Sequence, residues 1–194
     1  MILGVVGLIG AGKGEAAEIL ARKGFTILDM GDIIREEMKK AHLDITHKTD
    51  SVFPVEFRKK HGNDIIAKLI MKKAEKLENK NIVITGLRNT YELDYFKKVV
   101  PDMMLIAIEA PATVRFERLK VRGRPEDPKT KEQFDARTER ESKGNMGDEA
   151  QRKAGLNAVI ERADYVIQNA GTKQDLEAEV ERVLVRIRRR HHGN

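Results

Sequence analysis

The chain has 194 residues, with 37 Lys or Arg against 31 Asp or Glu, which gives a formal net charge of +6. This length suits one domain with a substantial core, and no Pro-, Gly- or Ser-rich stretch divides it, so we expect a single domain over residues 1–194. The absence of cysteine excludes disulfide frameworks and thiolate chemistry, and no apolar run is long enough to span a bilayer. We therefore expect a cytoplasmic protein without a membrane partner.

Apolar runs of strand length alternate along the chain with longer segments of helical spacing. The runs are Ile2–Val6, Phe25–Leu28, Asn81–Thr85, Met103–Ile108 and Asp164–Gln168. Strands this continuously apolar have no wet face, which is typical of a parallel sheet covered on both sides by helices. The predicted fold is an α/β three-layer sandwich with a mainly five-stranded parallel sheet.

The first apolar run leads into a glycine-rich loop and then an amphipathic segment, as in a P-loop. Glycines in such a loop turn backbone N–H groups toward phosphate oxygens, a lysine adds positive charge, and the following helix points its positive end at the same anion. An exposed glycine-rich turn is the alternative interpretation. The residues predicted to bind a nucleoside triphosphate, here called the glycine loop, are Gly7, Leu8, Ile9, Gly10, Ala11, Gly12, Lys13 and Gly14, followed by Glu15.

The glycine loop departs from the usual P-loop pattern after its lysine. Gly14 stands where a Ser or Thr hydroxyl normally contacts Mg²⁺. We therefore expect the cofactors ATP and Mg²⁺, with the metal held by phosphates, waters and carboxylates elsewhere, and we assign no metal ligand. Glu15 is interpreted either as a group near metal-bound water or as a first-turn acid that interacts with the helix dipole.

Prolines mark two of the later helices. Pro54 is predicted to open a helical stretch through Leu77, Pro111 another through Arg122, and a last helix begins after Thr172. Two polar segments, Ala41–Phe53 and Gly123–Lys131, have the composition of substrate loops or lids, or else of plain solvated connections. We expect residues 41–78 to form an acceptor-side insertion and residues 123–142 a lid.

Charged residues follow two of the predicted strands. In an open parallel sheet ligands gather at the carboxyl ends of the strands. Asp29, Asp32 and Arg35 come after the second run and Arg88 after the third, so we expect them to bind the acceptor. Asp29 and Asp32 also have structural interpretations, as a strand-end residue and a helix-start residue.

Further arginines flank the predicted lid. Arg118 and Arg122 share a helix face, Arg124 follows, and Arg137 and Arg140 lie in the next helical stretch. Closing the lid would bring these guanidinium groups toward the phosphates, and the alternative is a salt-bridged surface using acids such as Asp127 and Glu141. The catalytic candidates are Lys13, Arg88, Arg122, Arg124 and Arg137, and Arg118 is a nucleotide-binding candidate.

These motifs resemble those of the nucleoside monophosphate kinases. Adenylate kinases also carry Gly-Lys-Gly in the loop, and they have an Arg-x-x-x-Arg entry to the lid, as at Arg118 and Arg122. They show Thr-Gly-Asp-x-x-Arg where this chain has Met30–Arg35, and Asp-Gly-x-Pro-Arg near Thr85–Arg88. Thr85 replaces an acid that in relatives approaches metal-bound water.

The segment Ala163–Gly171 instead resembles dephospho-CoA kinases, where this loop packs on the adenine, which implies nucleotide contacts for Asn169 and Gly171. Over nearly its whole length the chain is most similar to a largely archaeal family of adenylate-kinase-related P-loop proteins. That resemblance implies the fold and ATP binding more directly than it implies the acceptor.

Three functions follow from these residues. The first is a small-molecule kinase that moves the γ-phosphoryl group of ATP to a nucleoside monophosphate, which needs no base. The second is phosphorylation of an alcohol, as in dephospho-CoA kinases, with Asp29 or Asp32 as base. The third is a switch ATPase with an RNA or protein partner bound through Arg186–Arg190. Nucleic acid is not favoured, because the few aromatic residues are not interleaved with basic clusters.

Overall fold

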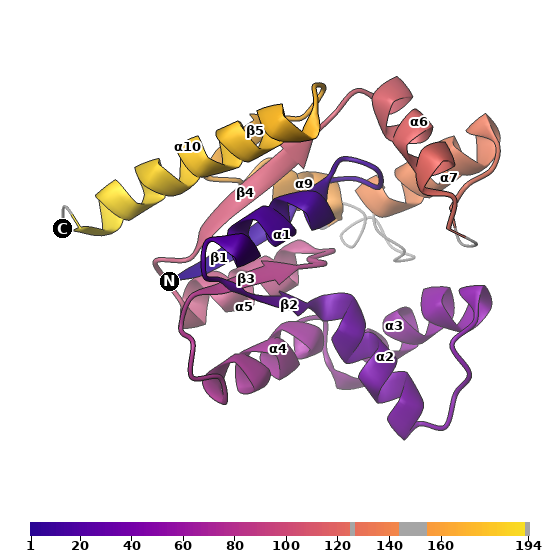
Figure 1. The fold of residues 1–194 in the computed structure, drawn as a ribbon. Coiled ribbons are helices and arrows are strands. Elements are labelled where there is room, and N and C mark those ends of the chain that lie inside the picture. Colours follow the sequence, from indigo (N-terminus) through magenta and orange to yellow (C-terminus); the bar gives the residue numbers. More distant parts are fainter. Residues whose placement is uncertain (125–126, 144–154, 193–194) are drawn as a thin grey trace.

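A computed structural model describes residues 1–124, 127–143 and 155–192 (Figure 1). Its centre is a five-stranded parallel sheet in the order β2-β3-β1-β4-β5. The strands are β1 (Ile2–Val6), β2 (Thr26–Asp29), β3 (Ile82–Thr85), β4 (Met104–Glu109) and β5 (Tyr165–Gln168). The predicted α/β class and all five predicted strands are confirmed.

Helices cover both faces of the sheet (Figure 1). Alternate residues of β1 point to opposite sides: Leu3 and Val5 pack with α1 and α10, whereas Val6 packs on the side of α4, α5 and α9. Two apolar cores therefore lie back to back, which explains why the strands are apolar at consecutive positions. The helices on these faces are α1 (Lys13–Arg22), α2 (Met30–Lys40), α4 (Ile65–Glu75), α5 (Thr90–Val99), α9 (Leu156–Ile160) and α10 (Lys173–His192).

Two more helices, α6 (Ala112–Arg122) and α7 (Lys131–Lys143), lie beyond the carboxyl end of the sheet, next to the glycine loop (Figure 1). Phe134 of α7 is fully buried in a small apolar cluster with Ile9 of the glycine loop and Leu119 of α6. This cluster attaches α7 to the loop that precedes α1.

The helix predicted to open at Pro54 begins earlier. The structure has α3 over His47–His61, with Pro54 inside the helix. Thr46 forms a capping box with Thr49, with Thr49 N donating to Thr46 Oγ1 at 3.2 Å and Thr46 N donating to Thr49 Oγ1 at 2.8 Å. This cap starts the helix inside the predicted polar segment Ala41–Phe53, and Gly62 ends it, so the stretch predicted to run through Leu77 is two helices, α3 and α4.

The other helix boundaries agree with the sequence signals. Pro111 is the N-cap of α6, and α10 begins after Thr172. Among the described residues, no helix combines the length and the apolar composition that crossing a membrane would require.

Candidate functional site

The glycine loop connects the end of β1 to the start of α1, at the carboxyl edge of the sheet. Gly12 has φ +104°, and a Cβ there would lie 2.3 Å from Nδ2 of Asn169. A side chain at this position is therefore excluded both by the backbone conformation and by close packing. At Gly14 a Cβ would meet nothing within 4 Å, so this residue borders open space.

The N-terminus of α1 faces the same space. Gly12 is its N-cap and supplies no side-chain cap, so within the described residues the first-turn N–H groups have neither an intrahelical nor a capping partner. Such an end attracts anions. Glu15 in the first turn pairs with Lys173 of α10, with 3.0 Å between Oε2 and Nζ.

Lys13 is partly buried beside the loop, where its Nζ donates to Leu8 O at 3.3 Å. Burial lowers the pKa of its ammonium group to about 8. The charge of Glu141 opposes this shift, and those of Arg88 and Arg122 add to it. Because burial disfavours the charged form of this ammonium group, a phosphate that binds beside it would stabilise that form.

Glu141 of α7 reaches into the glycine loop. Its Oε2 accepts a hydrogen bond from Ile9 N at 3.0 Å, and its Oε1 lies 3.4 Å from Arg88 Nη1 and 3.6 Å from Arg137 Nε. Burial works against ionisation, but Arg88, Lys13 and Arg137 outweigh it, and the pKa of Glu141 is lowered. The sequence offered Glu141 only as one of several acids on a salt-bridged surface, and this buried position was not predicted.

The candidates Arg118, Asn169 and Gly171 lie together. Arg118 donates to Asn169 O at 2.9 Å, to Asn169 Oδ1 at 3.2 Å and to Gly171 O at 3.1 Å. The amide of Asn169 donates to Ala11 O at 2.8 Å. The loop after β5 is thus joined to the glycine loop on one side and to α6 on the other.

The candidates on the acceptor side also cluster. Asp29 is the N-cap of α2 and accepts from Gly31 N at 2.9 Å and from Thr85 Oγ1 at 2.5 Å. Arg35 lies with its Nη2 2.5 Å from Asp32 Oδ1 and 3.6 Å from Asp29 Oδ1. The ends of β2 and β3 are therefore linked by a side-chain hydrogen bond next to a guanidinium group.

In the predicted lid, Arg122 binds the carboxylate of Asp127, with 2.9 Å between Nε and Oδ2 and a second contact from Nη2. Asp127 also accepts from Arg124 N at 3.1 Å. Hydrogen bonding to Arg122 lowers the pKa of Asp127. Asp127 is buried, whereas the sequence offered it only as one of several acids on a salt-bridged surface. Arg124 itself is exposed.

Glu92 was not predicted as part of any site. This fully buried residue of α5 accepts from Arg58 Nη2 at 2.7 Å and from Arg88 N at 2.9 Å. It therefore fixes the backbone of Arg88 and ties it to α3. Asn89 as N-cap and Glu92 three residues later form the sequence pattern of a capped helix start, which was the available signal.

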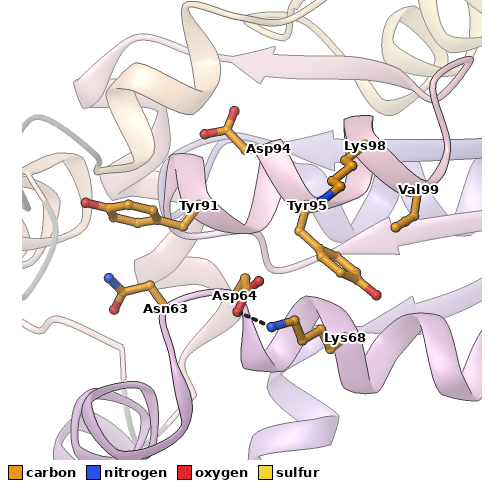
Figure 2. A pocket seen from close by; sticks show the side chains of 8 residues that line it. All are labelled: Asn63, Asp64, Lys68, Tyr91, Asp94, Tyr95, Lys98 and Val99. Carbon is orange, nitrogen blue, oxygen red and sulfur yellow. Dashed lines mark ion pairs between the residues drawn. The ribbon is translucent and has the colours of Figure 1, made fainter.

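A cavity of about 630 Å³ lies elsewhere, between the start of α4 and α5 (Figure 2). Tyr91 and Tyr95 of α5 face Asp64 and Lys68, which form an ion pair of 2.9 Å. None of the predicted site residues lines this cavity. Among the described residues, no three acidic or histidine side chains are grouped as a metal site would require.

Comparisons with known proteins agree with this architecture. A family model described as an AAA domain matches residues 3–142. A UPF0200 protein of Thermococcus onnurineus is 33% identical, covering 98% of this chain and 100% of its own. A UPF0200 protein of Methanocaldococcus jannaschii is 35% identical, covering 96% of this chain and 90% of its own. Shikimate kinase from Aquifex aeolicus has a TM-score of 0.58 and 18% identity over 100% of both chains, a likeness in fold.

Proposed function

The chain belongs to the UPF0200 family, and from this premise we propose that it transfers the γ-phosphoryl group of ATP to a nucleoside monophosphate. One observation carries the proposal: the N–H groups at the start of α1, Lys13, and arginines from two other elements converge on one space at the sheet edge. Phosphoryl transfer depends on such positioned positive charge more than on covalent help from the protein.

On the nucleotide side, Asn169 and Gly171 would border the adenine. The hydrogen bonds from Arg118 to this loop, and from Asn169 to Ala11 O, support a fixed distance between the base and the phosphates. Arg118 then acts by holding the adenine-side loop rather than by contacting phosphate. Residues 7–15 would hold the phosphates.

On the acceptor side, Asp29 supports a phosphate acceptor over an alcohol. An alcohol needs a base, and the two oxygens of Asp29 already accept hydrogen bonds from Gly31 N and Thr85 Oγ1. A nucleoside monophosphate carries an ionised oxygen and needs none. Arg35 and Arg88, from the ends of β2 and β3, would bind its phosphate, and residues 41–78 would form the wall around it.

In the reaction, an oxygen of the acceptor phosphate forms a bond to the γ-phosphorus, and the bond from that phosphorus to the β–γ bridging oxygen breaks, so that ADP leaves. Lys13, Arg88, Arg122, Arg124 and Arg137 would neutralise the charge on the transferred group once residues 123–142 close over it. Arg122 would have to exchange its contact with Asp127 for the phosphate.

The residues beside the glycine loop fit a Mg²⁺ ion that is held mainly by the phosphates of the substrate. Gly14 supplies no hydroxyl, and the space beside it is open, which leaves room for metal-bound water. When bound, Mg²⁺ supplies charge neutralisation at the β- and γ-phosphates.

The test is incubation of γ-labelled ATP and Mg²⁺ with a panel of ribo- and deoxynucleoside monophosphates, dephospho-CoA or RNA, counting both labelled acceptor and free phosphate. Lys13→Ala serves as the inactive control. We expect transfer to at least one nucleoside monophosphate and slow hydrolysis without an acceptor.

Two outcomes would contradict this proposal. Transfer to dephospho-CoA alone would identify an alcohol kinase and make Asp29 or Asp32 its base. Free phosphate as the main product, stimulated by RNA, would identify a switch ATPase.

A further inference from the structure

The carboxylate of Glu141 lies where an anion is expected, although it comes from the protein itself. Its partner, Ile9 N, belongs to the glycine loop and is 132 residues away in the sequence. The Glu141 side chain is only 11% exposed, although its partner Arg88 is 45% exposed, so the contact is partly buried. Among the loop N–H groups, the one at Ile9 is thus already bonded to a negative charge.

The groups around this carboxylate are those that a phosphate would use. Arg88 and Arg137 flank Oε1 at 3.4 and 3.6 Å, and the positive charge of Lys13 is close enough to favour ionisation. One N–H donor, two guanidinium groups and an ammonium group surround one carboxylate. The pKa of Glu141 is lowered despite burial, so the charge persists at neutral pH.

A phosphate oxygen and the Glu141 carboxylate cannot occupy this position together. Both need the hydrogen bond from Ile9 N, and like charges in a partly desolvated space repel strongly. We propose that Glu141 is an internal competitor that fills the phosphoryl position of the free protein and leaves when the phosphates bind. This inference rests on the proposed function, because it assumes that the glycine loop binds phosphates.

The attachment of α7 allows such a departure. The helix meets the glycine loop through the small cluster of Phe134, Ile9 and Leu119, and Arg115 Nη1 lies 3.4 Å from Thr138 Oγ1. Rotation of the Glu141 side chain breaks its contacts with Ile9 N, Arg88 and Arg137 and leaves this apolar cluster in place. It also transfers Arg88 and Arg137 from the carboxylate to the incoming phosphate, so phosphate binding and the rearrangement of α7 are linked.

The experiment compares wild type with Glu141→Gln, which keeps an acceptor for Ile9 N but removes the charge. Glu139→Gln is the matched control, because Glu139 lies on the same helix and is exposed, and its ion pair among the described residues is with Lys143 at 2.6 Å. Affinities for tripolyphosphate and for ATP are measured by calorimetry without metal. We expect Glu141→Gln to bind both at least tenfold more tightly, and Glu139→Gln to stay within twofold of wild type.

A second measurement uses the unmodified chain. Carbodiimide labelling followed by mass spectrometry reports which carboxylates are open to solvent. Glu141 should be protected in the free protein and labelled when tripolyphosphate is saturating, whereas Glu139 should be labelled equally in both states. This readout does not depend on the folding of a variant.

The outcomes separate the two proposals. Unchanged or weaker tripolyphosphate affinity in folded Glu141→Gln, or persistent protection of Glu141 at saturation, would overturn the internal competitor while leaving ATP-dependent transfer intact. Tight tripolyphosphate binding with release of Glu141, but no ATP binding, would support the competitor and contradict the nucleotide kinase.

Discussion

Arg58 of α3 and Glu92 of α5 form an ion pair that is almost closed to solvent, with 2.7 Å between Nη2 and Oε1 and side-chain exposures of 10% and 0%. The other Glu92 oxygen accepts from Arg88 N. One carboxylate therefore fixes both α3 and the backbone of an arginine proposed to bind phosphate.

Glu92→Ala should destabilise the protein by about 3–5 kcal/mol, because it leaves the Arg58 guanidinium buried without its partner. Denaturant unfolding measures the loss. Glu179→Ala, at an exposed pair with Arg182, should cost less than about 0.5 kcal/mol. Adding Arg58→Met to Glu92→Ala should recover part of the stability, and a purely additive double mutant would contradict the coupling.

ATP binding should weaken as the pH rises from about 7 to about 9.5, since the pKa of Lys13 is about 8 and only the charged form attracts phosphate. Bound phosphates favour the ammonium form and raise its pKa, so complex formation near pH 8.5 should take up protons. The phosphates of ATP titrate below this range. Calorimetry in two buffers of different ionisation enthalpy measures the uptake, which Lys13→Met should abolish. Equal heats in both buffers for wild type would refute the assignment.

Gly12→Ala should lose ATP binding at least tenfold and cost about 1–2 kcal/mol of stability, because a left-handed backbone and the Asn169 amide both oppose a Cβ. Gly14→Ala is the matched control, with open space at its Cβ, and helix propensity predicts a gain of about 0.5–1 kcal/mol. Thermal or denaturant unfolding and ATP titration check both. Equal behaviour of the two variants would show that loop shape is unimportant.

Asn169→Ala should weaken binding of ATP more than binding of tripolyphosphate. The variant removes the hydrogen bond from the Asn169 side-chain amide to Ala11 O and one of the Arg118 contacts. Together these contacts hold the loop after β5, which is proposed to border the adenine. Titrating each ligand into the variant and into wild type gives the loss of affinity for ATP relative to the loss for tripolyphosphate. A parallel loss for both ligands would mean that Asn169 serves the phosphate positions instead.

Arg35→Ala should raise the acceptor KM or lower kcat while ATP affinity stays within a few fold, because Arg35 lies in α2, where it pairs with Asp29 and Asp32. Steady-state kinetics with the acceptor found in the panel, together with ATP titration, separates these effects. If ATP affinity falls as far as it does in Lys13→Ala, Arg35 belongs to the nucleotide side.

Local signals predicted the sheet well, since each strand is a continuous apolar run and the glycine loop follows the first. They failed at α3, where Pro54 was interpreted as a helix start although Thr46 already caps one. Local signals also failed to indicate which acidic side chains are buried. Glu141 lies next to Ile9 because of how α7 is attached to the loop, and nothing within a few residues of either position indicates that contact.

Burial of Asp127 was likewise not indicated by its neighbours, although its partner Arg122 is only five residues away in the sequence. Its neighbours are polar and charged, so composition indicates a solvated segment, yet the carboxylate is buried under Arg122. Exposure of a charged residue depends on its partner, and here Arg122 and Arg124 N both bind the Asp127 carboxylate. Arg118 and Asn169, both expected on the nucleotide side, do lie in contact, and their part in nucleotide binding stays a prediction.

The position of β1 at the centre of the sheet has a consequence for synthesis of the protein. Ile2 pairs with Ile82 and Val6 with Ala107, so this first strand emerges from the ribosome long before either neighbour exists. Non-local pairing of this kind is slow and is completed late. The glycine loop after β1 therefore acquires its folded shape only once β3 and β4 have been made, and a nascent chain ending before β4 should be unable to retain ATP.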